Sequence, residues 1–301
     1  SYSTESGMTG YTWSIVGGSI NSGSTTNTVS VTWNTTGAQS ISVNYTNGNL
    51  CTGAAPTPLA VTVNSLPTAS ITPDPAETCA GKALAMNGNP AGGSGVYSTH
   101  AWTGAGATSL SSTSSQTPNF TNNTAGTYAL IYTVTDNKGC KGSDNITVTV
   151  QPKPTANAGG TGATCTGTPY TVSGASATNG SILWTVQTGT GAITGGATTT
   201  SPTYTPGAGE TGAVELLMTV TGAGVCSTST ATDIFNLTVN PLPVPTITGS
   251  TSVCLNSTQS YSTESGMTGY TWSIVGGSIN SGSTTNTVSV TWNTTGAQSI
   301  S

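Results

Sequence analysis

Cysteine is the residue type in this chain whose number and spacing are best suited to chemistry. The six cysteines occupy an early and a late position in a unit that recurs along the 301 residues. The early cysteines are Cys79, Cys165 and Cys254, and the late cysteines are Cys140, Cys226 and Cys51. Cys79 precedes Cys140 by 61 residues, and Cys165 precedes Cys226 by the same interval. Paired cysteines at a constant spacing predict disulfides formed in an oxidising compartment.

From this spacing we expect Cys79 to pair with Cys140, and Cys165 to pair with Cys226, so that each bond closes a loop inside one unit. A loop of about 60 residues would contribute roughly 4 kcal/mol in the chain-entropy description. Cys51 and Cys254 then have their partners in adjacent repeats. Buried reduced thiols are the alternative state, and metal ligation is disfavoured because no Cys-x-x-Cys pair occurs.

Other side chains with catalytic chemistry are scarce. His100 is the only histidine, and no Gly-x-Ser-x-Gly nucleophile motif accompanies the many serines. Asp74, Asp136 and Asp144 are candidates for calcium at a junction, but they lack the dense Asp/Asn loop that such a site needs. The sequence therefore predicts a protein that is not an enzyme, with no catalytic, cofactor-binding or metal residue.

Composition restricts the class of protein further. Charged residues make up 4% of the chain, arginine is absent, and the formal net charge is −5. Nucleic-acid binding is excluded because phosphate contacts need clustered cations. No apolar run approaches the roughly 20 residues of a membrane span. Short runs rich in β-branched and aromatic residues favour ordered strands over disorder.

A long internal repeat organises the chain. Residues 1–42 and 260–301 are identical, which predicts a window cut from a tandem array with a period of 259 residues. Proline-rich segments that each follow a strand-like run divide this period at Pro67, Pro154 and Pro243. We therefore expect the C-terminal part of a first module in residues 1–65, a second module in 66–152, a third in 153–241, and the N-terminal part of the next first module in 242–301.

Alternating apolar residues predict antiparallel strands with one buried face. Tyr128, Leu130, Tyr132 and Val134 illustrate the pattern, and turn residues follow such runs. Many short strands of this kind predict β-sandwiches. Four tryptophans are expected in the core, namely Trp13, Trp102, Trp184 and Trp272. Trp33 and Trp292 lie in a Val-Thr-Trp-Asn run, from which they could face outward.

Two segments carry a family resemblance. Residues 126–137, GTYALIYTVTDN, resemble the long-strand signature of PKD-like domains, a branch of the immunoglobulin-like sandwiches. Residues 261–272 resemble PKD-like repeats in very large secreted surface proteins of Bacteroidota. The resemblance covers all three modules, although the usual Trp-x-Phe-Gly-Asp-Gly is replaced around Trp102 and Trp184. It implies an all-β fold of tandem immunoglobulin-like (PKD-like) β-sandwich domains in an elongated string, located outside the cell or on its surface.

These observations together predict a structural or adhesive segment of a long extracellular fibre or cell-surface adhesin. Disulfides and proline-rich joints would stiffen it, and its partners would be neighbouring repeats of the same chain or fibre. One alternative is an array that binds glycans or other cell surfaces. A second alternative is a filament subunit that polymerises head to tail, with terminal half-domains completing each other by strand addition.

Overall fold

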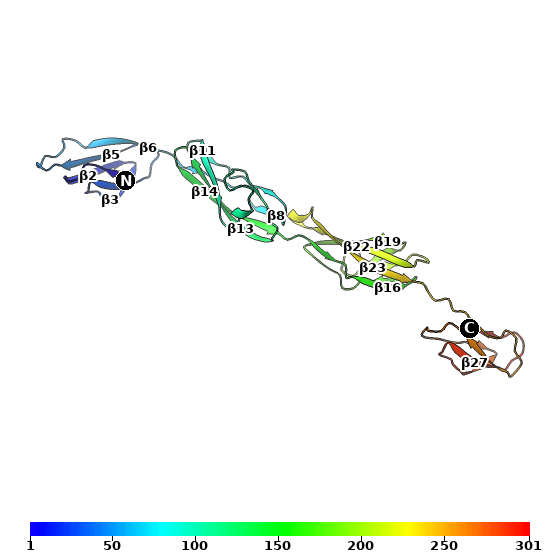
Figure 1. Cartoon of the computed structure of the whole chain (residues 1–301). Coiled ribbons are helices and arrows are strands. Elements are labelled where there is room, and N and C mark those ends of the chain that lie inside the picture. The colour runs from blue at the N-terminus through cyan, green and yellow to red at the C-terminus, as the bar shows by residue number, and fades with distance from the viewer.

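The computed structural model describes residues 1–301 and shows β-sandwich units following one another along an extended axis (Figure 1). It contains no α-helix, and its only helical turns are two short 3-10 segments, η1 (Ala107–Ser109) and η2 (Gly224–Cys226). None of its helical segments has the length and apolar character needed to cross a membrane. The N- and C-termini lie in the lobes at opposite ends of the string (Figure 1).

The second and third modules have the same main sheet. The strands of the second module are β7 (Pro67–Thr68), β8 (Ala76–Cys79), β9 (Leu84–Ala85), β10 (Ala91–Gly92), β11 (Tyr97–Thr103), β12 (Asn119–Phe120), β13 (Gly126–Asp136) and β14 (Lys141–Gln151). Those of the third are β15 (Thr155–Asn157), β16 (Thr161–Cys165), β17 (Tyr170–Thr171), β18 (Ser176–Thr178), β19 (Gly180–Thr188), β20 (Ala192–Gly195), β21 (Thr203–Thr205), β22 (Gly212–Gly222) and β23 (Thr230–Asn240). The four-stranded sheets run in the orders β11-β13-β14-β8 and β19-β22-β23-β16.

In both sheets a short edge strand runs parallel to the last strand of its module. β8 pairs with the end of β14, which places Cys79 opposite Gln151. β16 pairs with the end of β23, which places Cys165 opposite Asn240. Cys79 and Cys165 therefore each lie level with the last strand residue before a proline-rich segment.

The cores form where the alternating faces of these strands meet the smaller sheets. In β13 the side chains of Leu130, Tyr132 and Val134 are fully buried, and in β22 those of Leu216 and Met218 are. Each module has a core cluster of 11 buried residues, enough for a separate hydrophobic core in each. The expected all-β fold of tandem β-sandwiches is confirmed.

The two ends of the chain show the same residues in two contexts. Residues 1–65 contain β1 (Tyr2–Ser3), β2 (Thr9–Val16), β3 (Gly18–Ser22), β4 (Thr28–Trp33), β5 (Gly37–Thr46) and β6 (Thr57–Val63). Residues 242–301 contain β24 (Thr258–Ser262), β25 (Ile274–Val275), β26 (Gly277–Ser281), β27 (Thr287–Trp292) and β28 (Ser299–Ile300). β2 pairs with β5, but its C-terminal copy is reduced to β25, because a strand persists only where a partner completes its ladder.

The tryptophans of the Val-Thr-Trp-Asn run face inward, so the outward orientation considered for them is wrong. The Trp292 side chain is 6% exposed, and its Nε1–H donates to the hydroxyl of Tyr261 at 3.0 Å. Trp33 makes the corresponding bond to the hydroxyl of Tyr2, also at 3.0 Å. The buried Trp292 indole leaves no flat exposed face for a sugar ring, whereas Trp33 is half-buried.

Each of the four tryptophans expected in the core makes the same kind of hydrogen bond. Each donates its Nε1–H to a backbone carbonyl 13 or 15 residues further along, and the four acceptors are Thr26, Ser115, Thr199 and Thr285. Trp102 and Trp184 are 2% and 3% exposed, whereas Trp13 is half-buried. In β2, β11 and β19 the indole thus fastens a loop to the sheet, whereas Trp272 makes the same bond from outside any strand.

Replacing Trp184 by phenylalanine should lower the stability of the third module by about 1–2 kcal/mol, because the Thr199 carbonyl loses its donor and the smaller ring leaves a void. Hydrogen exchange of β22 and β23 amides, followed by mass spectrometry on the full chain, measures this change. Leu183→Ala is the matched control, since Leu183 is 51% exposed on the adjacent position. Equal effects of the two substitutions would contradict the role given to the indole.

Glu210 is the carboxylate most enclosed by donors in the third module. Its side chain is 9% exposed and accepts hydrogen bonds from the Thr190 N–H at 2.6 Å and the Gly207 N–H at 2.8 Å. The buried Tyr204 hydroxyl donates to it at 2.8 Å. Burial opposes ionisation, but these donors outweigh it and hold the pKa of Glu210 below its ordinary value.

A lowered carboxylate pKa stabilises the fold at neutral pH. The contribution is present above the unfolded-state pKa of roughly 4.3 and is lost as the pH falls through the lower folded-state pKa. Glu210→Gln should therefore destabilise the third module by about 2 kcal/mol at pH 7, and the stability of the variant should change less as the pH is lowered. Exchange rates of β22 amides between pH 7 and pH 3 test this, after correction for the intrinsic rate. Glu215→Gln in the same module, whose carboxylate accepts only from the Thr188 hydroxyl, is the control.

Candidate functional site at the junction between the second and third modules

The second module ends and the third begins at a short proline-rich segment. Pro152 and Pro154 follow the last residue of β14, where the missing N–H groups stop the ladder and restrict the backbone. In Figure 1 the cyan β8 of the second module lies beside the yellow hairpin that connects β22 and β23 of the third. We call this region, residues 151–154 with the two elements that flank it, the junction.

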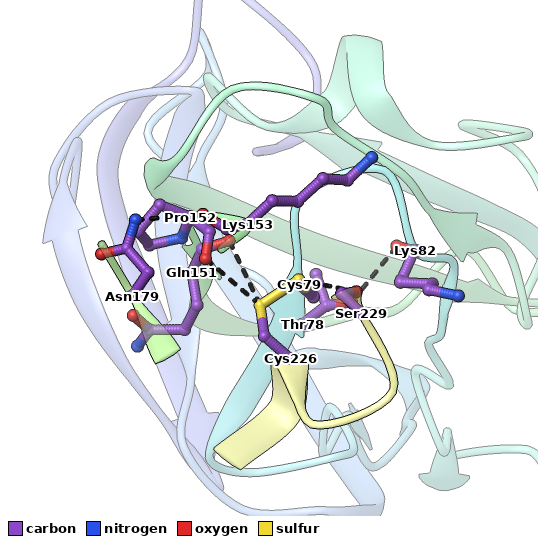
Figure 2. Close-up of a disulfide and its surroundings, with 9 residues drawn as sticks. All are labelled: Thr78, Cys79, Lys82, Gln151, Pro152, Lys153, Asn179, Cys226 and Ser229. Atoms are coloured by element: carbon purple, nitrogen blue, oxygen red, sulfur yellow. Dashed lines mark hydrogen bonds between the residues drawn. A yellow bond between two sulfur atoms is a disulfide. The ribbon is translucent and has the colours of Figure 1, made fainter. Parts of the chain in front are cut away.

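A disulfide crosses the junction. Cys79, at the end of β8, is bonded to Cys226, in η2 of the β22–β23 hairpin, with a Cα–Cα distance of 4.9 Å (Figure 2). The two residues are 147 positions apart in the sequence and belong to different modules. Both are buried, with 1% and 2% of their surface exposed. The bond thus fixes the exit of one sandwich to the entrance of the next.

The predicted bonds inside modules, Cys79–Cys140 and Cys165–Cys226, are wrong. Cys140 and Cys165 are free thiols, as are Cys51 and Cys254. The last strand of the module separates the two cysteines. The late cysteine lies just before the first residue of this strand, and the early cysteine lies level with the last residue of the strand. Eleven residues of β14 span about 35 Å, whereas a disulfide needs Cα atoms within about 7 Å.

The linker and the hairpin enclose the sulfur atoms. The Cys226 sulfur lies 3.4 Å from the carbonyl oxygen of Pro152, and the Ser229 hydroxyl lies 3.6 Å from the Cys79 sulfur (Figure 2). Asn179 donates its side-chain amide to the Lys153 carbonyl at 3.0 Å, which ties the third module to the linker as well. Figure 2 shows the ammonium end of Lys153 pointing away from the disulfide. Contacts at the bond are therefore to backbone and neutral groups.

Two backbone bonds hold Cys79 in place. The Ala80 N–H donates to the Gln151 carbonyl at 2.9 Å, which continues the parallel pairing of β8. The Lys82 N–H donates to the Cys79 carbonyl at 2.9 Å, which closes a tight turn with Gly81 at a φ of 75°. A β-carbon at Gly81 would lie 2.9 Å from Asn123 Oδ1, so glycine suits this position on two grounds.

Three other polar residues singled out in the sequence, His100, Asp136 and Asp144, make structural contacts, whereas Asp74 is exposed. His100 Nδ1 lies 2.5 Å from the Tyr132 hydroxyl, and burial raises the pKa of Tyr132 to about 12. Burial opposes ionisation of Asp136, yet the backbone N–H groups of Cys140, Ser94 and Lys138 hold its pKa below the ordinary value. Asp144 accepts the Ile71 N–H at 2.8 Å. No group of three His, Cys, Asp or Glu side chains is placed to hold a metal ion.

Reasoning from the sequence missed the bond between modules because it used only the interval between cysteines. The signal that identifies it is positional. Cys226 lies in the turn before the last strand, and Cys79 lies at the end of the edge strand β8. These positions are opposite ends of a sandwich, because the edge strand runs parallel to the last strand. A prediction based on the end of the sandwich at which each cysteine lies would have paired cysteines of consecutive modules.

Comparison with family models identifies PKD-like domains in this chain. The family model "PKD-like domain" matches residues 1–61 and 240–301, and the model "K319L-like, PKD domain" matches residues 78–150. No curated protein matches the chain. Similar solved structures include the human desmocollin-1 ectodomain, with 10% identity, a TM-score of 0.35, and coverage of 94% of this chain and 68% of that one. Fibronectin(III)-like modules of Clostridium thermocellum CbhA share 16% identity, with a TM-score of 0.28 and coverage of 57% and 95%.

The two family models together cover well over half of the residues and describe the same kind of domain. The third module, which neither model matches, repeats the sheet order of the second and its parallel edge strand. The chain therefore contains PKD-like domains, within a tandem array of immunoglobulin-like β-sandwich domains.

Proposed function

We propose that this chain is a non-catalytic structural or adhesive segment of a long extracellular fibre or cell-surface adhesin. In this function the sandwiches transmit tension and keep a binding surface elsewhere in the fibre at a distance from its anchor. The observation that carries the proposal is the buried Cys79–Cys226 bond, which joins separate domains at a junction. A bond of this kind constrains how modules move relative to each other, which matters in a rod and has no role in the stability of a single domain.

The same bond changes the path of a pulling force. Tension that reaches Cys79 from the N-terminal side passes through the sulfur atoms to Cys226 and leaves toward the C-terminus. The intervening chain, which includes β13, β14 and most of the third module, carries no load. Because the two cysteines are 147 positions apart in the sequence, about 500 Å of extended chain is withheld from stretching.

The surroundings and composition favour a place outside the cell. Disulfides persist in oxidising compartments and are rare in the cytosol. The chain has four lysines and no arginine, which leaves few sites for proteases that cleave after basic residues. Threonine, serine, asparagine and glycine supply most of its polar surface in place of charged side chains.

Force spectroscopy on the full chain, attached at its two ends, tests the proposal. The oxidised protein should stretch to a contour length about 500 Å shorter than the Cys79→Ser/Cys226→Ser variant, because the bond withholds the enclosed residues. Reduction of the wild-type protein should restore the missing length.

The matched control is Cys51→Ser/Cys254→Ser, which removes two exposed free thiols and leaves the junction intact. It should stretch like the wild-type protein under oxidising conditions. If the wild-type protein and the Cys79→Ser/Cys226→Ser variant reached the same length, the chain would not carry tension through the junction bond and the proposal would fail.

A further inference from the structure

We propose that every junction between consecutive modules carries a disulfide from the early cysteine of one module to the late cysteine of the next. Under this rule Cys165 of the third module bonds to the copy of Cys51 in the next module along the chain, which is the following copy of the first module. Cys254 likewise bonds to the copy of Cys140 in the following second module. The inference is independent of what the fibre binds, and it assigns a partner to each of the four free thiols.

The early cysteines share one local geometry. Each carbonyl accepts a hydrogen bond from the N–H three residues later: Lys82 to Cys79 at 2.9 Å, Thr168 to Cys165 at 2.9 Å and Ser257 to Cys254 at 3.1 Å. The residue between, two positions after the cysteine, has a positive φ in each turn: Gly81 at 75°, Gly167 at 76° and Asn256 at 61°. Glycine and asparagine are the residues that such a turn requires. The turn that presents Cys79 to its partner is therefore repeated at Cys165 and Cys254.

The pairing next to this turn is also repeated. The Ala80 N–H donates to Gln151 at the second module's exit, and the Thr166 N–H donates to Asn240 at the third module's exit, both at 2.9 Å. A proline follows each acceptor directly. Cys165 thus occupies at its junction the place that Cys79 occupies at the bonded one, and its side chain is exposed.

The late cysteines lie at the opposite end of their modules, in the turn before the last strand. Asn47 Oδ1 accepts the Cys51 N–H at 3.0 Å, and Asp136 Oδ1 accepts the Cys140 N–H at 2.9 Å. The backbone bonds in the other direction, from Asn47 to Cys51 and from Asp136 to Cys140, are 3.0 and 2.9 Å. Cys51 and Cys140 are therefore held in the same turn conformation, at the end of the module that faces the preceding one. Cys226 lies at the same end of its module, but in the 3-10 turn η2, where its N–H donates to the Ala223 carbonyl.

Spacing along the chain agrees with the rule. Cys79 and Cys226 are 147 residues apart. Continuing the 259-residue period places the next copy of Cys51 145 residues after Cys165, and the next copy of Cys140 145 residues after Cys254. The segment from Val63 to Pro67 has the same length as the segment from Val150 to Pro154. Of the six cysteines, Cys79 and Cys226 are also the one pair whose two members both lie within residues 1–301 under this rule.

Each of these bonds forms from two thiols. The sulfur atoms join with loss of two protons and two electrons, which reduce a disulfide oxidant such as oxidised glutathione to two thiols. Exposure of Cys51, Cys165 and Cys254 gives the oxidant access to them.

The test is a chain that continues the repeat, made of residues 1–301 followed by a second copy of residues 43–301. It carries twelve cysteines, because both segments contain all six. Refolding with oxidised and reduced glutathione, followed by alkylation and mass spectrometry of the monomer, should give four disulfides and four alkylated thiols. Two of the bonds should link peptides of Cys51 with Cys165 and of Cys140 with Cys254. Pairing inside modules would instead give five disulfides and two thiols.

Substitutions in a single copy identify which cysteine is used, since the two copies give identical peptides. Cys51→Ser in the second copy should abolish the Cys51–Cys165 link and raise the alkylated thiols from four to five. Cys51→Ser in the first copy should keep the link and lower the thiols to three. Bonds inside modules, or more than four alkylated thiols in molecules that have formed both Cys79–Cys226 bonds, would overturn the proposal. The second of these outcomes would leave unchanged the stretching result expected for the Cys79–Cys226 bond, so it distinguishes a failure of this proposal from a failure of the proposed function.

Discussion

The parallel pairing of a short edge strand with the last strand of its module is the constraint on which the junction depends. This register brings Cys79 level with Gln151, at the end of the sandwich where the chain leaves for the next module. The antiparallel hairpin before the last strand brings Cys226 to the other end of its own sandwich. Each module thus has one cysteine at its exit and another at its entrance. These two cysteines cannot bond to each other, because about 35 Å of strand separates them, whereas the exit cysteine of one module lies close to the entrance cysteine of the next.

The partner strands that are available also determine which secondary structure the two identical 42-residue segments form. Residues 9–16 form the long β2 because β5 extends beyond the shared sequence and offers a ladder along its whole length. In the C-terminal copy only Ile274–Val275 remains as strand, whereas Trp292 is covered because Asn256 and Ser257 pair with its backbone. Local propensity is the same in both copies, so the difference arises from contacts distant in sequence. In this chain, a strand of a module thus forms along its full length only where the other strands of the same module are present to pair with it.

Much of the fold could be predicted from the sequence, because alternation in β13 and β22 and the prolines at 152 and 154 are local signals with direct structural meaning. The all-β class, the strand faces and the tandem order depend on such signals. The cysteine partners could not be predicted from spacing, since an interval of 61 residues inside a module and one of 147 residues across a junction are both reasonable loops in a chain-entropy description. Only the direction of the edge strand distinguishes them. The inward orientation of Trp33 was missed for a similar reason, because its hydrogen-bond partner Tyr2 lies 31 residues away on another strand.

Bonds at every junction would give the array two interleaved covalent paths. A path that enters the second module at Cys140 follows β14, the linker and the start of the third module to Cys165, and then crosses to the next module. These 25 residues reach at most about 90 Å when fully extended. The folded sandwiches they bridge already measure about 70 Å, from two last strands of 11 residues each. The loaded path is therefore nearly taut in the native state, and unfolding of either domain would release little length. Resistance to stretching would then come from the placement of the cysteines more than from the stability of any one sandwich, which suits a chain whose modules have few charged contacts.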